Sequence, residues 1–147
     1  MLETIGLFVM LAGFVLGLGA VTVIDLHGFL ARTSPYWTEA TIRAHKVTKP
    51  LIWAGMLLAI VGGAILYRDL PLAGIPFVQL LIAVALVVNG CFLSFVVSPE
   101  LLRREQQGRA AELLPATLQT KIAISFVISF AGWWSALFLL AWELTRI

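Results

Sequence analysis

Four long apolar runs, separated by short polar stretches, constrain this chain more than any other feature. Each run contains 18 to 23 residues, and together they cover 4–24, 50–67, 75–97 and 122–142. A helix rises about 1.5 Å per residue, so about 20 residues cross a hydrocarbon core of about 30 Å. Lipid offers no partner to an unpaired backbone amide or carbonyl, so each run is predicted to be helical.

The composition leaves little room for anything else. Of the 147 residues, 61% are hydrophobic and 12% are charged, whereas soluble domains are about half apolar and about a quarter charged. These proportions exclude a water-soluble enzyme, a nucleic-acid-binding domain and a disordered tail. The sequence therefore predicts an all-α, polytopic membrane four-helix bundle, made of two antiparallel hairpins in a single transmembrane domain.

Local signals set the expected helix limits. Ser34 followed by Pro35 is typical of a helix start, with a serine cap and proline at the first helical position. Pro50 lacks an amide proton and its ring clashes with the carbonyl of Lys46, so a kink or break is expected there. The helices are accordingly predicted at about 4–31, 36–67 with a break near Pro50, 75–104 and 116–145.

The basic residues predict the orientation. Eight of the ten lie in the first and third connections: Arg32, Arg43, Lys46, Lys49, Arg103, Arg104, Arg109 and Lys121. Only Arg68 and Arg146 fall on the opposite side. The positive-inside rule assigns the basic connections to the cytoplasm, which places both termini outside. We therefore expect a multi-pass protein of the bacterial cytoplasmic (inner) membrane, with the lipid bilayer as its surroundings and no nucleic-acid partner.

Small and bulky residues predict where helices meet. Gly13 and Gly17 have the GxxxG spacing that lets two membrane helices approach closely. On the fourth helix, Ser125 and Trp133 lie on one face, which is expected to point into the bundle. Trp133 and Trp134 fall near the middle of that helix, so one of them must face the bundle or a neighbour. A homo-oligomer or a larger membrane complex is an expected context for such surfaces.

A few polar side chains could carry chemistry. Ionisable groups within membrane helices are costly and suggest function by default. Asp25 and His27 are two positions apart, about 200° around a helix, and so point to different faces. Counting from the Ser34–Pro35 turn predicts similar depths for His27 and His45. Further polar groups of the expected intramembrane cluster are Lys49, Asn89 and Ser125.

Three interpretations of these groups stay open. In the first, Asp25 forms a structural ion pair with Lys49 or His45. In the second, His27 and His45 are the two axial ligands of a b-type haem between facing helices. In the third, a polar cavity for proton transfer or a small ligand is lined by Asp25, His45, Lys49, Asn89 and Ser125. No metal-ligand spacing and no nucleotide-binding or hydrolase motif occurs in the sequence, so no metal site is predicted.

The layout also resembles a known group of proteins. The second run has Trp53 and a Gly62–Gly63 pair, and the third has Asn89 followed by Ser98-Pro99-Glu100-Leu101 before a basic patch. This pattern resembles small bacterial four-helix membrane proteins of the copper-resistance D-like type, over most of the chain. The resemblance implies metal- or haem-linked membrane chemistry. It assigns no ligand, because the histidine typical of the first helix and the lysine that opens the third have no counterparts here.

The polar residues and the absence of enzyme motifs predict only a broad function. The sequence favours a small redox, proton-transfer or cofactor-binding membrane module, with haem b as a candidate cofactor. One alternative is a non-catalytic subunit or scaffold of a larger membrane complex, and another is a small proton-coupled transporter. Whether the protein is an enzyme is left open.

Overall fold

The computed structural model describes residues 1–145, and all of its regular elements are helices. They are α1 (Leu2–Leu30), α2 (Pro35–Leu66), α3 (Ile75–Phe92), the π-helical turn η1 (Leu93–Val97), α4 (Ser98–Gln106) and α5 (Ala116–Leu144). Since α3, η1 and α4 follow one another without a gap, the described chain forms four long helices, each long and apolar enough to cross a membrane. The predicted all-α four-helix membrane fold is confirmed.

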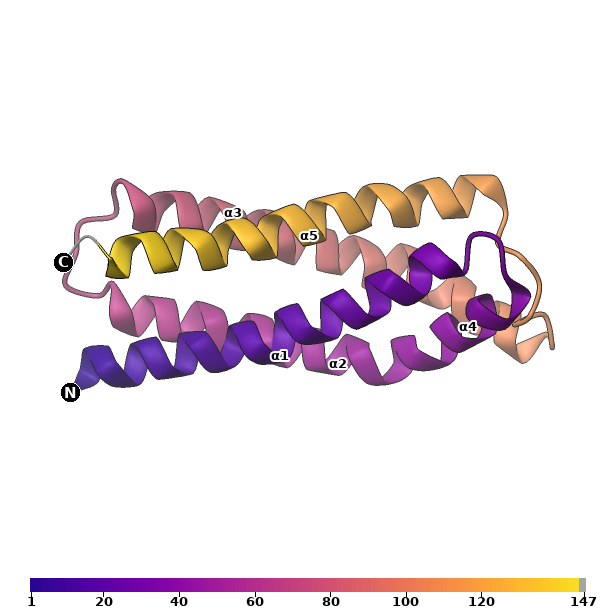
Figure 1. The fold of residues 1–147 in the computed structure, drawn as a ribbon, viewed down its shortest axis with the longest axis horizontal. Coiled ribbons are helices and arrows are strands. Elements are labelled where there is room, and N and C mark those ends of the chain that lie inside the picture. Colours follow the sequence, from indigo (N-terminus) through magenta and orange to yellow (C-terminus); the bar gives the residue numbers. More distant parts are fainter. Residues whose placement is uncertain (146–147) are drawn as a thin grey trace.

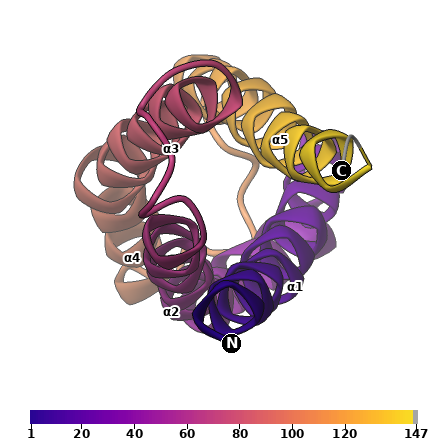
Figure 2. The ribbon, with the colours of Figure 1, turned by 90° about the vertical axis from the view of Figure 1, so that its left-hand side faces the viewer.

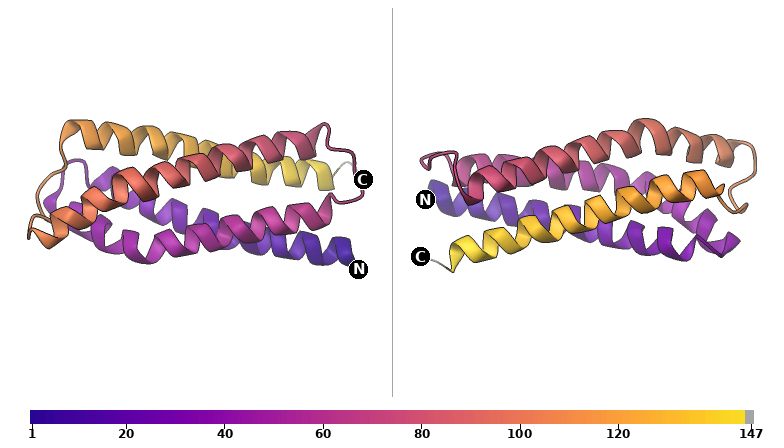
Figure 3. Two further views of the ribbon diagram at one scale, coloured as in Figure 1. Left: turned by 180° about the vertical axis from the view of Figure 1, so that it is seen from behind. Right: turned by 90° about the horizontal axis from the view of Figure 1, so that it is seen from above.

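The four long helices run antiparallel along one axis (Figure 1). Viewed end-on, their order around the bundle is α1, α2, α3 and α5, so α1 is adjacent to both α2 and α5 (Figure 2). Both termini and the α2–α3 turn lie at one end, which we call the termini end. The α1–α2 and α4–α5 connections lie at the other, the basic end (Figure 3). Of the basic residues predicted outside the basic connections, Arg68 lies in the α2–α3 turn, and Arg146 is outside the described residues.

Helix α2 begins at the predicted serine cap and is continuous where a break was predicted. The Ser34 hydroxyl accepts a hydrogen bond from the Trp37 amide at 3.5 Å, and Pro35 is the first helical residue. The helix runs through Pro50 without a break. The proline leaves the Lys46 carbonyl without its helical partner, and the axis of α2 bends in its first half (Figure 1). Pro50 is therefore accommodated within one continuous helix, and the predicted break is absent.

The third crossing contains a wide turn that the sequence analysis did not predict. Residues Leu93–Val97 are π-helical, immediately before Ser98 and Pro99. The ring of Pro99 would clash with the carbonyl four residues earlier, that of Phe95, in a regular α-helix. Widening the turn moves this carbonyl away from the ring, as π-bulges do inside longer helices. The widened turn lets one helix continue from the membrane-crossing α3 into the charged α4.

Glycines bring α1 and α2 into direct backbone contact. A Cβ atom added at Gly13 would lie 2.6 Å from the Gly55 carbonyl oxygen, and one added at Gly6 would lie 2.7 Å from the Leu66 amide nitrogen. Such distances leave no room for a side chain. The glycine pair predicted to face another helix is thus used inside the first hairpin, where small residues permit the close packing that stabilises membrane helices.

The second contact of α1 is with α5, through a tryptophan. Trp133 is 1% exposed and packs edge-on against Phe14, with ring centroids 6.0 Å apart. A Cβ atom added at Gly17 would lie 2.8 Å from Cζ2 of the Trp133 ring and still closer to Cη2, so the indole fills the space that this glycine leaves. Trp134 is 47% exposed. Trp133 is therefore the member of the pair that faces the bundle, and it joins α1 to α5 at the centre of the core.

Candidate functional site

The α1–α2 contact fixes which residues of the two helices share a level. Close contacts join Met10 to Gly62 and Gly17 to Gly55. Continuing this antiparallel register toward the basic end brings His27 opposite His45. The Nδ1 atom of His27 and the Nε2 atom of His45 are both buried and have no hydrogen-bond partner among the described residues. Two facing turns of the hairpin therefore each carry a buried imidazole nitrogen that forms no hydrogen bond within the described chain.

Asp25 lies on the same turns of α1. Its Oδ2 atom is also buried without a hydrogen-bond partner within the described chain. Large apolar side chains at this level point outward, since Leu26 is 59% exposed and Val47 on α2 is 65% exposed. Such side chains suit contact with lipid, whereas Lys46, beside Val47, has a half-exposed side chain that pairs with Glu105 at the same level. A carboxyl group in this position is costly while it is charged.

The structure does not contain the ion pair that was one interpretation of Asp25. Among the described residues, no ion pair includes Asp25. Lys49 instead lies 3.5 Å from the Ser98 hydroxyl of α4, and Lys46 pairs with Glu105 of α4 at 2.7 Å. The lysines of α2 therefore join α2 to α4 at the basic end, and Asp25 is left without a neutralising partner.

The two histidines fit a bis-histidine haem only in part. Their free ring nitrogens suit axial ligation. The space between their helices does not suit it, because α1 and α2 contact each other more extensively than any other helix pair. The Thr38 hydroxyl of α2 donates a hydrogen bond to the Ala31 carbonyl at 3.0 Å on one side of the pair, and glycine contacts close the other side. A porphyrin between the rings would have to part these helices, so we derive no haem chemistry. No group of three or more His, Cys, Asp or Glu among the described residues could hold a metal ion.

Asn89 and Ser125 form a pair of their own in the core. The Ser125 hydroxyl donates to Asn89 Oδ1 at 2.8 Å, and Asn89 Nδ2 donates to the Ser125 carbonyl at 3.1 Å. Both residues are buried, at 7% and 1% exposure. The structure thus joins two residues of the expected polar cluster, whereas Asp25 lies on α1 toward the basic end and Lys49 lies against Ser98 of α4. The pair holds α3 against α5.

Replacing Asn89 by Leu is expected to destabilise the bundle by about 1–2 kcal/mol, because Ser125 then keeps a buried hydroxyl without its acceptor. Detergent-titrated unfolding of the purified protein measures this loss. In a double-mutant cycle with Ser125→Ala, the coupling is expected near about 0.6 kcal/mol, typical of hydrogen bonds between membrane helices. Additive effects of the two substitutions would show that the pair contributes nothing.

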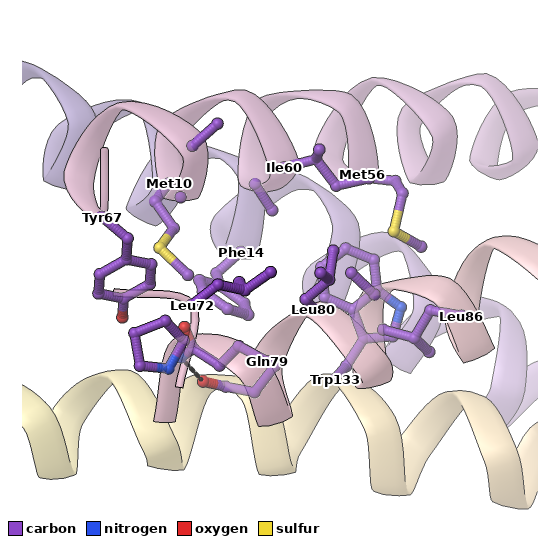
Figure 4. A pocket seen from close by; sticks show the side chains of 16 residues that line it. Met10, Phe14, Met56, Ile60, Tyr67, Leu72, Gln79, Leu80, Leu86 and Trp133 are labelled. Carbon is purple, nitrogen blue, oxygen red and sulfur yellow. Dashed lines mark hydrogen bonds between the residues drawn. The ribbon is translucent and has the colours of Figure 1, made fainter. Parts of the chain in front are cut away.

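A second candidate site lies in the half of the bundle near the termini end, and the sequence analysis missed it. A cavity of about 300 Å³ lies between the two hairpins. Its walls are mainly apolar, and Figure 4 shows Tyr67 and Gln79 toward one end of it and Met56, Leu86 and Trp133 toward the other. The Tyr67 hydroxyl and the Gln79 Oε1 atom are buried and have no hydrogen-bond partner in the described chain. A lone glutamine inside the apolar run 75–97 was the available signal.

The Tyr67 hydroxyl remains a hydrogen-bond donor. The Gln79 side chain lies close to it, yet the geometry completes no hydrogen bond between the two groups. A phenol has an ordinary pKa of about 10 and keeps its proton at neutral pH.

The fold and its buried groups define the class of protein: a multi-pass membrane protein whose four-helix bundle carries unpartnered polar atoms in both halves. Comparison of the chain with protein-family models, with curated proteins and with solved structures gives no match in any of the three.

Proposed function

We propose that the protein is a small proton-transfer module of the bacterial cytoplasmic membrane, in which Asp25, His27 and His45 bind the transferred proton. One observation carries the proposal: each of these three side chains has a buried polar atom without a hydrogen-bond partner in the described chain. Such atoms are costly to bury unless they bind something. A proton is the ligand that both carboxyl and imidazole groups bind, and it needs no additional space in a tightly packed helix pair.

The distribution of basic residues supports the orientation of the protein in the membrane. Arg32, Arg43, Lys46 and Arg109 lie at or near the basic end, together with the other bases of the two connections. The positive-inside rule assigns this end to the cytoplasm. Asp25 is five residues from the end of α1 at Leu30, so protons reach the site from the cytoplasmic side over about one and a half helical turns.

Infrared spectroscopy of the protein in lipid nanodiscs tests the proposal directly. Difference spectra between acidic and alkaline buffer are expected to contain the carbonyl-stretch band of a carboxylic acid in apolar surroundings. Asp25→Asn is expected to abolish that band, because an amide binds no proton at these pH values. Asp69→Asn is the matched control, since Asp69 lies in the exposed α2–α3 turn with its side chain 70% exposed, and it is expected to leave the band unchanged.

The histidines provide a second measurement. His27→Gln and His45→Gln are each expected to change the pH at which the Asp25 band titrates, since both imidazoles lie within about one helical turn of the level of Asp25. A wild-type protein that lacks the band, or a band that persists in Asp25→Asn, would overturn the assignment of Asp25. A band unaffected by either histidine substitution would overturn the role of the histidines in proton transfer.

A further inference from the structure

The cavity near the termini end has an open side. Ile60 of α2 and Leu80 of α3 both line it, and both are partly exposed, at 41% and 44%. These two helices also make the sparsest contact among the neighbouring long helices of the bundle. The cavity therefore opens between α2 and α3, toward the lipid that surrounds a membrane bundle, and Leu72 of the α2–α3 turn, which is 65% exposed, lines its edge near the termini end.

The polar end of the cavity offers one donor and one acceptor. Gln79 is 6% exposed, and its amide nitrogen donates to the Ala136 carbonyl of α5 at 3.1 Å. This bond holds the side chain so that Oε1 is the group left to accept. The Tyr67 hydroxyl lies toward the same end (Figure 4) and is free to donate. A single hydroxyl group of a ligand could accept from Tyr67 and donate to Gln79.

The rest of the wall suits a ring. Phe14 and Trp133 are both lining residues, and their rings stand nearly perpendicular to each other at 79°. The sulfur-bearing side chains of Met10 and Met56 complete the wall. Aromatic and thioether groups make favourable contacts with the faces and edges of other rings. The volume of about 300 Å³ is at the lower limit of about 300–1,000 Å³ for ligand pockets, enough for a ring but not for a long lipid tail.

We propose that this cavity binds the ring of a neutral, lipid-soluble hydroxyl compound, of the class to which membrane quinols belong, with its tail leaving between α2 and α3. The ring lies between Phe14, Trp133 and the two methionines. Its hydroxyl group exchanges hydrogen bonds with Tyr67 and Gln79. The site is in the opposite half of the bundle from Asp25, so the proposal does not depend on proton transfer at the basic end.

Titration calorimetry with a decyl-substituted benzoquinol, kept reduced, tests the proposal. The protein in nanodiscs is compared with empty nanodiscs of the same lipid, and saturable binding of one quinol per chain is expected. Tyr67→Phe is expected to weaken binding about fivefold, because it removes one buried hydrogen bond. The corresponding quinone is expected to bind more weakly than the quinol, since it has no hydroxyl to donate to Gln79.

A matched pair of substitutions on α3 locates the ligand. Ala83 lines the cavity, whereas Ala85 is exposed on the outer surface and is not among the lining residues. Ala83→Phe fills the cavity and is expected to weaken binding by about tenfold or more, and Ala85→Phe is expected to leave it unchanged. Heats equal to those of empty nanodiscs would overturn the proposal, as would binding that survives Ala83→Phe. Equally tight binding of decanol would show that the cavity holds an alkyl chain and would overturn the assignment of a ring.

Discussion

Replacing Gly13 by Leu is expected to prevent the first hairpin from closing, whereas the same replacement at Gly19 leaves the fold intact. At Gly13, even a Cβ atom would lie 2.6 Å from the Gly55 carbonyl oxygen and would also meet the backbone of Ala59. Those atoms belong to a helix backbone, so only a separation of α1 from α2 makes room. At Gly19, nothing lies within 4 Å of the added atom.

The measurement is unfolding of each variant in mixed detergent, followed by far-ultraviolet circular dichroism and tryptophan fluorescence. Overpacking a well-packed core costs about 1–3 kcal/mol, and the loss at Gly13 is expected at the upper end of this range or above it. Both variants gain the same side chain and the same helix propensity, so their difference reports the α1–α2 contact alone. Equal stabilities for the two variants would contradict the backbone contact at Gly13.

The number and extent of the helices could be predicted because the hydrocarbon core sets the length of every crossing. The glycines of α1 could likewise be recognised as packing residues. The helix that packs against each glycine could not be predicted, since Gly13 contacts α2 and Gly17 also contacts the Trp133 ring of α5. Small residues indicate a close helix contact without identifying the helix that makes it. Which helix approaches depends on how all four helices tilt, and no single helix carries that information.

Proline effects were predicted in part. A proline removes one hydrogen bond and crowds one carbonyl, and the helix can respond by breaking, bending or widening. Helix α2 continues through Pro50 with a bend, whereas the third crossing widens to a π-helical turn before Pro99. The local sequence identifies the carbonyl that each proline crowds. It does not predict whether the helix breaks, bends or widens there, because packing against neighbouring helices decides which change costs the least free energy.

The two candidate sites differ in how far they could be predicted from the sequence. Asp25, His27 and His45 stand out because ionisable groups are rare in apolar runs. Their lack of partners could not be predicted, since Lys49 lies within about half a helical turn of the level of Asp25, yet its side chain contacts Ser98 of α4 instead. The cavity could not be predicted from the sequence for a different reason. It exists because α2 and α3 diverge near the termini end, and its polar residue Gln79 is one of only two amide side chains in the run 75–97, the other being Asn89.

Substitution of Trp133 and of Trp134 tests which of the two side chains stabilises the core. Trp133 is 1% exposed, packs on Phe14 and Gly17, and forms part of the cavity wall. Replacing it by Ala is expected to destabilise the bundle by about 3 kcal/mol, the lower end of the range of about 3–5 kcal/mol for buried aromatics in soluble cores. The lower end applies because the surfaces of membrane helices that separate are covered by lipid. The substitution then removes packing contacts, without a large change in the free energy of transferring apolar surface to water.

Trp134→Ala is the matched control, and the same detergent-titrated unfolding measures both variants. Trp134 is 47% exposed, beside Phe130 on the outer face of α5, and a surface substitution of this kind is expected within about 0.5 kcal/mol of the wild type. A Trp134→Ala loss as large as that of Trp133→Ala would contradict this assignment, because it would place a stabilising contact on the outer face of α5.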